Sequence, residues 1–290
     1  MATDTAELLK KVRRIELKTK GLSNQIFSGE YHSAFKGRGM AFSEVREYTV
    51  GDEVRTIDWN VTARLGTPYV KIFEEERELT VILVVDLSAS DNFGSVEQLK
   101  KSVITEICAV LAFSAITNND KIGVIFFTDQ IEKFIPPKKG KSHILRIIRE
   151  LIEFKPEGKA TDISMALRYL NNVVKKRSIA FLLSDFMDNN YENSLKLANK
   201  KHDLVALNIT DRRELEMPKI GRVLFADPET GEMNWINTNS SRVRANYAER
   251  AQQRQLEIKD ACRRAGVDMA TIATNESYIT PLRNLFSKRS

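Results

Sequence analysis

Three oxygen-bearing side chains follow a buried strand at alternate positions. Asp86, Ser88 and Ser90 follow the run 79–85, in which every residue is apolar or β-branched and Val, Ile and Leu predominate. Such a run predicts a strand that a parallel sheet buries on both faces. Because open α/β sheets bind ligands at the carboxyl ends of their strands, these side chains stand where this architecture builds its sites.

Two further oxygen donors occupy comparable places. Thr161 lies in a loop directly before a predicted helix, and Asp185 follows the predicted strand 178–183. We expect the sheet to bring Asp185 beside Asp86, since neighbouring parallel strands end at the same edge. Two carboxylates and three hydroxyls suit a hard divalent cation, and Mg²⁺ takes octahedral oxygen ligands while keeping bound waters. The five residues therefore predict a Mg²⁺ site, with Ca²⁺ and Mn²⁺ as alternatives.

The sequence offers little for catalysis. It contains no Gly-x-Ser-x-Gly nucleophile elbow. The histidines, which are His32, His143 and His202, lie outside the acidic motifs, so a general base is missing. Residues 140–142 read Gly-Lys-Ser, but Ile135 stands where a phosphate loop needs its first glycine. We therefore expect a protein that is not an enzyme. The alternative is a metal-dependent phosphoesterase or nuclease that uses the same carboxylates.

Strands and helices alternate between residues 79 and 210. Apolar runs predict strands at 79–85, 121–128, 178–183 and 203–209, and amphipathic stretches predict helices at 96–118, 143–154, 162–174 and 191–200. This order is typical of the α/β class with a doubly wound, mostly parallel sheet. Further elements are an edge strand at 131–135 that Pro136 and Pro137 end, a hairpin at 222–236, a helix at 241–265, a strand at 267–273 and a helix at 277–286.

The first 77 residues precede this alternation. Residues 5–26 predict an amphipathic helix, and 28–40 predict a glycine-rich loop. Residues 42–64 mix strand-like alternation with a turn at Gly51-Asp52 and many charges, and 69–73 predict a strand. We expect 1–77 to form an N-terminal extension and 78–290 to form the α/β domain, with a hairpin inserted near 220–237.

Composition indicates a soluble globular protein. The 290 residues are 42% hydrophobic and 29% charged, which allows a sizeable core. Apolar stretches are too short to span a bilayer and the first residues lack a signal-peptide pattern, so we expect a cytoplasmic protein. Cys108 and Cys262 lie in apolar helical patterns and predict reduced core thiols. The net charge of +6 leaves an adaptor for nucleic acid or a membrane surface as an alternative function, but the positive charges are scattered, which favours a solvated basic surface.

The oxygen donors carry a resemblance to a known site. Asp86, Ser88, Ser90, Thr161 and Asp185 resemble the metal-ion-dependent adhesion site of von Willebrand factor A domains. The resemblance implies a Rossmann-like fold in which these five residues hold Mg²⁺. It also implies that the open coordination position takes a Glu or Asp from a partner protein.

The upstream block carries a more specific resemblance. Segments 37–42, 44–48, 51–59, 62–64, 73–78 and 227–231 are similar to the bacterial domain-of-unknown-function-58 family, and the likeness covers nearly the whole chain. It implies a partnership with a MoxR-type AAA+ ATPase, and with other von Willebrand A-like proteins, in chaperone-like assembly or activation of protein complexes. The client and the oligomeric state stay open.

Within that block we single out six candidate partner-binding residues. These are Arg46, Asp52, Arg55, Asp58, Trp59 and Arg64. The alternative is an ion-pair network that staples the N-terminal segment to the sheet, with Trp59 as a packing anchor.

Overall fold

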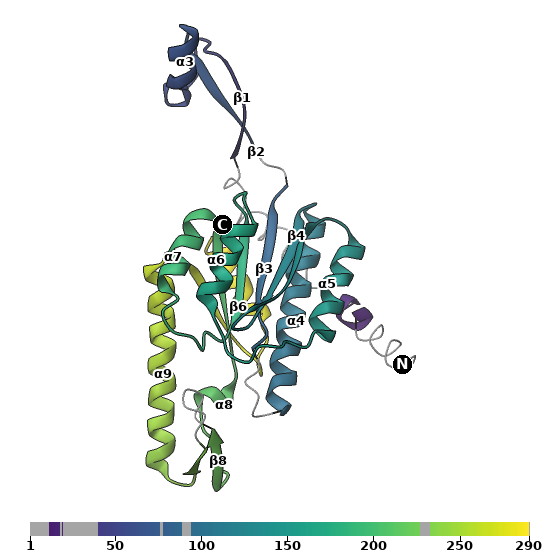
Figure 1. Ribbon diagram of the computed structural model, residues 1–290, viewed down its shortest axis with the longest axis vertical. Coiled ribbons are helices and arrows are strands. Elements are labelled where there is room, and N and C mark those ends of the chain that lie inside the picture. The colour runs from purple at the N-terminus through teal and green to yellow at the C-terminus, as the bar shows by residue number, and fades with distance from the viewer. Residues whose placement is uncertain are drawn as a thin grey trace.

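A six-stranded sheet forms the centre of the protein. The computed structural model describes residues 12–17, 19, 40–75, 78–88, 94–226 and 233–289. The strand order is β10-β7-β6-β3-β4-β5 (Figure 1). The strands are β3 (Thr80–Asp86), β4 (Lys121–Phe127), β5 (Ile131–Lys138), β6 (Ile179–Ser184), β7 (Asp203–Thr210) and β10 (Asp268–Ala273). Within this sheet β5 runs antiparallel to β4 and the other pairs are parallel. The predicted α/β class is confirmed.

Helices cover both faces of the sheet. One face packs against α4 (Gly94–Thr117), α5 (Lys141–Glu153) and α10 (Ile279–Ser287), and the other against α6 (Ile163–Val173), α7 (Glu192–Lys201) and α9 (Ser241–Arg264). Along β3, Val81, Leu83 and Val85 join the first cluster, while Ile82 and Val84 join the second. All five are fully buried, which is why this strand is apolar without alternation.

The strand order reverses at β3. From this strand the sheet continues through β4 and β5 on one side and through β6, β7 and β10 on the other. Such a reversal leaves a crevice outside the carboxyl ends of the strands, where ligands bind in open α/β sheets. Asp86 is the last residue of β3 and Ser184 the last of β6, so both stand at that crevice.

The edge strand β5 is longer than predicted. The sequence predicts that it ends before Pro136, whereas the strand continues through both prolines to Lys138. An edge strand hydrogen-bonds on one side, so a residue without an N–H is tolerated where it faces away from the neighbouring strand.

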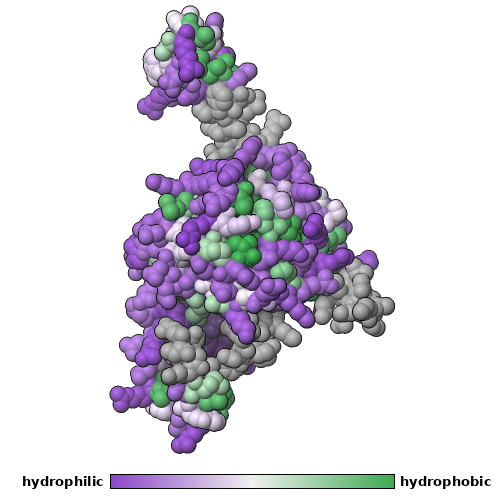
Figure 2. Space-filling model, viewed as in Figure 1, coloured by the Kyte–Doolittle hydropathy of each residue, from purple (hydrophilic) through white to green (hydrophobic). Residues whose placement is uncertain are grey.

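Residues 40–75 form an arm outside the main sheet. Strands β1 (Met40–Glu47) and β2 (Tyr69–Glu75) pair antiparallel, and between them lie the 3-10 turn η2 (Val54–Thr56) and the helix α3 (Trp59–Leu65). The arm projects from the end of the sheet at which β3 begins (Figure 1). Apolar side chains are exposed on it (Figure 2), namely Val50, Val54, Trp59 and Leu65.

Two short helices were not predicted from the sequence. Asp58 caps α3 by accepting from the N–H groups of Asn60 and Val61, a signal that the dense charges around it obscured. The one-turn helix α8 (Arg212–Leu215) follows β7.

Of the predicted helix 5–26, residues 12–17 and residue 19 are described, and residues 12–17 are helical. The other parts of this helix and the predicted loop up to residue 39 lie outside the described residues.

The predicted hairpin is confirmed near the other end of the molecule. Strand β8 (Arg222–Ala226) pairs antiparallel with β9 (Met233–Asn237). Figure 1 shows α8 and this hairpin beyond the carboxyl ends of the main strands, opposite the arm.

None of the helices in the described part of the chain is long and apolar enough to cross a bilayer. Cys108 and Cys262 are buried, and burial raises the pKa of both thiols, as expected for core cysteines.

A buried histidine gives the fold a pH dependence. His202 is fully buried after α7, and neither of its ring nitrogens has a hydrogen-bond partner among the described residues. Burial, followed by the charges of Lys201 and Arg177, lowers the pKa of His202 to about 4. The folded protein therefore holds this imidazole neutral at pH values where the unfolded chain protonates it.

We expect His202 to lower the free energy of unfolding by about 2–3 kcal/mol as the pH falls from about 6.5 to about 4. The loss follows because the unfolded chain takes up a proton that the folded state excludes. The variant His202→Leu should lack this contribution, and urea unfolding of both proteins across the range measures the difference. Identical pH profiles for the two proteins would contradict the assignment.

Candidate metal centre

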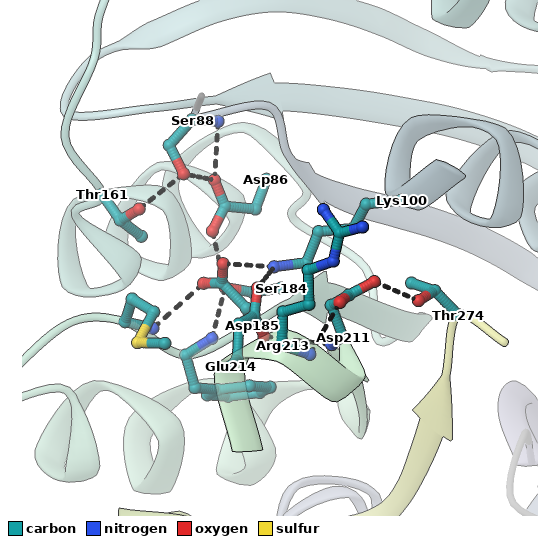
Figure 3. A network of polar contacts seen from close by, with 12 residues as sticks. Asp86, Ser88, Lys100, Thr161, Ser184, Asp185, Asp211, Arg213, Glu214 and Thr274 are labelled. Atoms are coloured by element: carbon teal, nitrogen blue, oxygen red, sulfur yellow. Dashed lines mark hydrogen bonds and ion pairs between the residues drawn. The ribbon is translucent and has the colours of Figure 1, made fainter. Parts of the chain in front are cut away.

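Asp86, Ser88 and Thr161 form a connected set of oxygens at the carboxyl end of β3 (Figure 3). The N–H and the hydroxyl of Ser88 donate to Asp86 Oδ1 at 2.9 and 2.5 Å. The hydroxyl of Thr161 donates to Ser88 Oγ at 2.6 Å, although 73 residues separate the two in the chain. The structure thus brings together three of the five predicted ligands. Ser90 lies outside the described residues.

Ser184 holds the second oxygen of Asp86. Its hydroxyl donates to Asp86 Oδ2 at 2.6 Å and accepts from the N–H of Phe186 at 2.9 Å. Sequence reasoning missed this residue, although its position at the end of an apolar strand, directly before Asp185, was a usable signal. Ser184 and Ser88 together fix the orientation of the Asp86 carboxylate from both sides.

Asp185 lies beside Asp86 but is bound by a lysine. Its Oδ2 accepts from Lys100 Nζ at 2.7 Å, and its Oδ1 accepts from the N–H of Met187 at 3.1 Å. Burial, followed by the charge of Asp185, raises the pKa of Asp86 well above its usual range. The two carboxylates therefore share one electrostatic environment, as the sequence predicted for neighbouring strand ends.

Lys100 is the second residue that sequence reasoning missed. It projects from α4 with a side chain that is 11% exposed, and its Nζ also donates to Glu214 Oε1 at 2.7 Å. Burial lowers the pKa of Lys100, but Asp185 and Glu214 outweigh burial and leave this pKa above its ordinary value. A signal existed, because Lys100 lies on one helical stripe with the buried residues Ile104 and Ile107.

The loop that carries Thr161 is fastened to β4 and β5. Glu132 Oε1 accepts from the N–H of Gly158 and from the hydroxyl of Thr128, both at 2.8 Å. The N–H of Asp162 donates to the carbonyl of Thr128 at 3.0 Å. These contacts place Thr161 next to Ser88 from a segment far along the chain.

The donor set fits a hard divalent cation. The converging atoms are carboxylate and hydroxyl oxygens, without nitrogen or sulfur, and such ligands suit Mg²⁺, Ca²⁺ or Mn²⁺ better than softer transition metals. Across the described part of the chain, this centre included, no group of three or more His, Cys, Asp or Glu is arranged to hold a metal, so the hydroxyls are an essential part of the donor set. Asp86, Ser88 and Thr161 would hold the ion, directly or through water, with Asp185 beside them.

The charged residues of the arm interact within the arm. Arg46 forms a two-pronged ion pair with Asp52, at 2.6 and 2.7 Å, and lowers the pKa of that carboxyl. Asp58 caps α3 and lies 3.4 Å from Lys71 Nζ. These contacts build the turn and the helix of the arm, so they do not support the interpretation that the block staples this segment to the main sheet.

Trp59 is 67% exposed, which is too exposed for a packing anchor in this chain. Arg55 and Arg64 are exposed as well. All six candidate partner-binding residues belong to the arm, whereas the candidate metal centre lies at the opposite end of β3 (Figure 1). The protein therefore carries two separate candidate contact surfaces.

The fold and the centre define the class of protein. A six-stranded, mostly parallel sheet between two helical layers, with hydroxyl and carboxylate oxygens at its reversal point, is von Willebrand factor A-like. The chain belongs to the family described as "Protein of unknown function DUF58", whose model matches residues 44–257.

Relatives with similar sequences include the uncharacterized protein Rv1480 of Mycobacterium tuberculosis. It is 26% identical over 289 residues, which cover 99% of this chain and 91% of that protein. The uncharacterized protein YeaD of Bacillus subtilis is 27% identical over 109 residues, which cover 38% of this chain and 25% of that protein.

Solved structures show a more distant likeness. An aerotolerance-related membrane protein from Bacteroides fragilis matches with a TM-score of 0.45 and 14% identity, over 73% of this chain and 98% of that one. Proximal thread matrix protein 1 of the mussel byssus, with a zinc-occupied MIDAS motif, matches with a TM-score of 0.38 and 18% identity, over 46% and 38% of the two chains.

Proposed function

We propose that this protein is a metal-dependent protein-interaction module that binds an acidic side chain of its partner and does not catalyse a reaction. The observation that carries the proposal is the connected set of oxygens from Thr161, Ser88 and Asp86 at the reversal point of the sheet. A bound Mg²⁺ would supply a coordination position that a partner carboxylate can fill. Asp86 provides its negative charge in a fixed orientation, and the two neutral hydroxyls leave the ion with positive charge for an anionic ligand.

The proposed partner is a MoxR-type AAA+ ATPase. The membership of the chain in its family, together with the resemblance of the upstream block, supports this choice. In that role the protein would contribute to the chaperone-like assembly or activation of other complexes. Mg²⁺ is the proposed ion because it combines hydroxyl, carboxylate and water ligands.

The hairpin offers apolar surface at the same end of the sheet as the metal centre. Leu224 pairs with Trp235, and Met233 lies two residues before Trp235, so all three share one face of the hairpin. All three are exposed. We place the partner contact over the metal centre and this face, since charge-assisted and apolar contacts then act together.

A binding titration tests the proposal. We expect the affinity for a purified MoxR-type ATPase to fall about ten-fold or more when EDTA replaces Mg²⁺, and equally in Asp86→Asn. The matched control is Asp260→Asn, an exposed carboxylate on α9 that should have no effect. Affinity that is unchanged by both EDTA and Asp86→Asn would refute metal-mediated binding and leave the family membership intact.

Two tryptophan variants locate the contact in the same assay. Trp235→Ala should weaken the complex without changing metal binding, whereas Trp59→Ala, on the arm, should weaken it less. The reverse order would move the contact to the arm. Metal-dependent hydrolysis of phosphate esters or nucleic acid that Asp86→Asn abolishes would favour an enzyme instead.

A further inference from the structure

We propose that Lys100 sets the metal affinity of the centre by competing with the bound cation for Asp185, and that Glu214 holds the lysine in that role. This inference rests on the proposed metal centre and adds a residue that is not a ligand. Lys100 reaches the carboxyl ends of the strands from α4, opposite the loop of Thr161 (Figure 3).

The position of the lysine is built into the fold. Its Nζ bridges Asp185 and Glu214 at 2.7 Å to each, and its side chain is nine-tenths buried. Glu214 is itself fixed, because its other oxygen accepts from the N–H of Asp211 at 3.1 Å in the capping box of α8. Asp211 is tied in turn to Thr274 at 2.6 Å. Lys100 therefore cannot leave without uncovering two carboxylates whose side chains are only 12% and 20% exposed.

The charges at the centre match one divalent cation. Lys100 Nζ contacts Asp185 and Glu214, and Asp86 lies beside Asp185, so these three carboxylates carry up to two more negative charges than the single ammonium balances. The ammonium repels an incoming cation and occupies the Asp185 oxygen that would otherwise face it. It also pairs Asp185 while no metal is bound, so that this carboxylate is never buried alone.

Two single variants should shift metal affinity in opposite directions. Lys100→Met removes the positive charge and keeps the length of the side chain, so the dissociation constant for Mn²⁺ should fall about ten-fold. Glu214→Gln removes one negative charge and keeps an oxygen for the cap of α8, so the constant should rise several-fold. A purely structural role of the pair would move both variants in the same direction, because both break the same bridge.

The experiment is a calorimetric titration of the full chain with Mn²⁺ and with Mg²⁺, with thermal unfolding of each variant recorded in EDTA. The control is Lys101→Met, the next residue along α4, whose Nζ donates instead to the carbonyl of Phe154 at 2.9 Å. It should bind the metals as the wild type does.

The outcomes separate this inference from the proposed function. If the wild type binds the metals and Lys100→Met binds them equally well or more weakly, the role of the lysine is overturned and the proposed function is not. If Lys100→Met does not fold, Glu214→Gln decides, and unchanged or tighter binding there overturns the inference. Binding by Lys100→Met but not by the wild type supports it. Absence of metal binding in every protein overturns the proposed function and this inference together.

Discussion

Asp86→Asn is expected to abolish Mg²⁺ binding and, in the absence of metal, to make the protein more stable. The amide oxygen can accept the two hydrogen bonds that Ser88 donates, and the amide N–H can donate to Ser184 Oγ. The substitution therefore keeps the local structure while removing a buried negative charge beside Asp185. Without that charge the hydroxyls alone do not hold a hard cation.

The raised pKa of the Asp86 carboxyl decides the sign of the stability change. Burial, followed by the charge of Asp185, raises the pKa of Asp86, so the folded state disfavours the ionised form. The gain in Asp86→Asn should therefore be largest at pH 8, where wild-type Asp86 is ionised. It should vanish as the pH falls towards the usual range of aspartate. We expect a gain on the order of 2 kcal/mol at pH 8 in EDTA.

Urea unfolding with EDTA and with Mg²⁺ measures both effects. Wild type should gain about 2.7 kcal/mol at a Mg²⁺ concentration 100 times its dissociation constant, and Asp86→Asn should gain nothing. The matched control is Asp120→Asn, because burial also raises the pKa of Asp120, to about 6. Asp120 precedes β4 at the other end of the sheet, so this control should keep the Mg²⁺ effect. A Mg²⁺ effect that survives in Asp86→Asn would contradict the assigned ligand.

The sequence determined those parts of the fold that depend on continuous apolar runs. Strand β3 is buried on both faces and its end is marked by Asp86, so the strand, its parallel type and the place of the site were all predictable. The prolines of β5 were misinterpreted because proline ends a central strand but not an edge strand, and a single sequence does not reveal which strand is the edge.

The site was predictable where residue type alone implies chemistry. Asp86, Ser88 and Thr161 are oxygen donors at strand or loop ends, and the fold brings them together. Lys100 was not predicted as part of the site, because a lysine within a helix is usually solvated. Its two partners come from segments 85 and 114 residues further along the chain. Long-range pairing of this kind leaves no local pattern.

The arm could be recognised from its sequence, but its role could not be predicted. Its residues are distinctive enough to indicate a family, yet their described contacts are local, such as the pair of Arg46 with Asp52. Because this segment contributes little to the main core, contact with a partner is our proposal for its role. Its exposed Trp59 agrees with that explanation.

Gly158→Ala should weaken metal binding although residue 158 provides no ligand. A Cβ at this position would lie 2.1 Å from Asp129 Oδ1, 2.2 Å from Thr128 Oγ1 and 2.9 Å from Thr128 Cβ. Asp129 lies on a loop, but Thr128 is fully buried and its hydroxyl is bonded to Glu132, so Thr128 cannot turn away. The loop must therefore move instead, and the hydrogen bond from Gly158 N–H to Glu132 is lost or stretched.

Because Thr161 is three residues further along the same loop, this movement withdraws its hydroxyl from Ser88. We expect the dissociation constant for Mg²⁺ to rise about ten-fold or more and the protein to lose about 1–3 kcal/mol of stability. Lys159→Ala, at an exposed neighbour in the loop, is the matched control and should change neither quantity. Calorimetric titration and urea unfolding of the two variants measure both effects. Wild-type affinity in Gly158→Ala would mean that Thr161 does not contribute to the metal centre, since the overpacked loop cannot keep its hydroxyl in place.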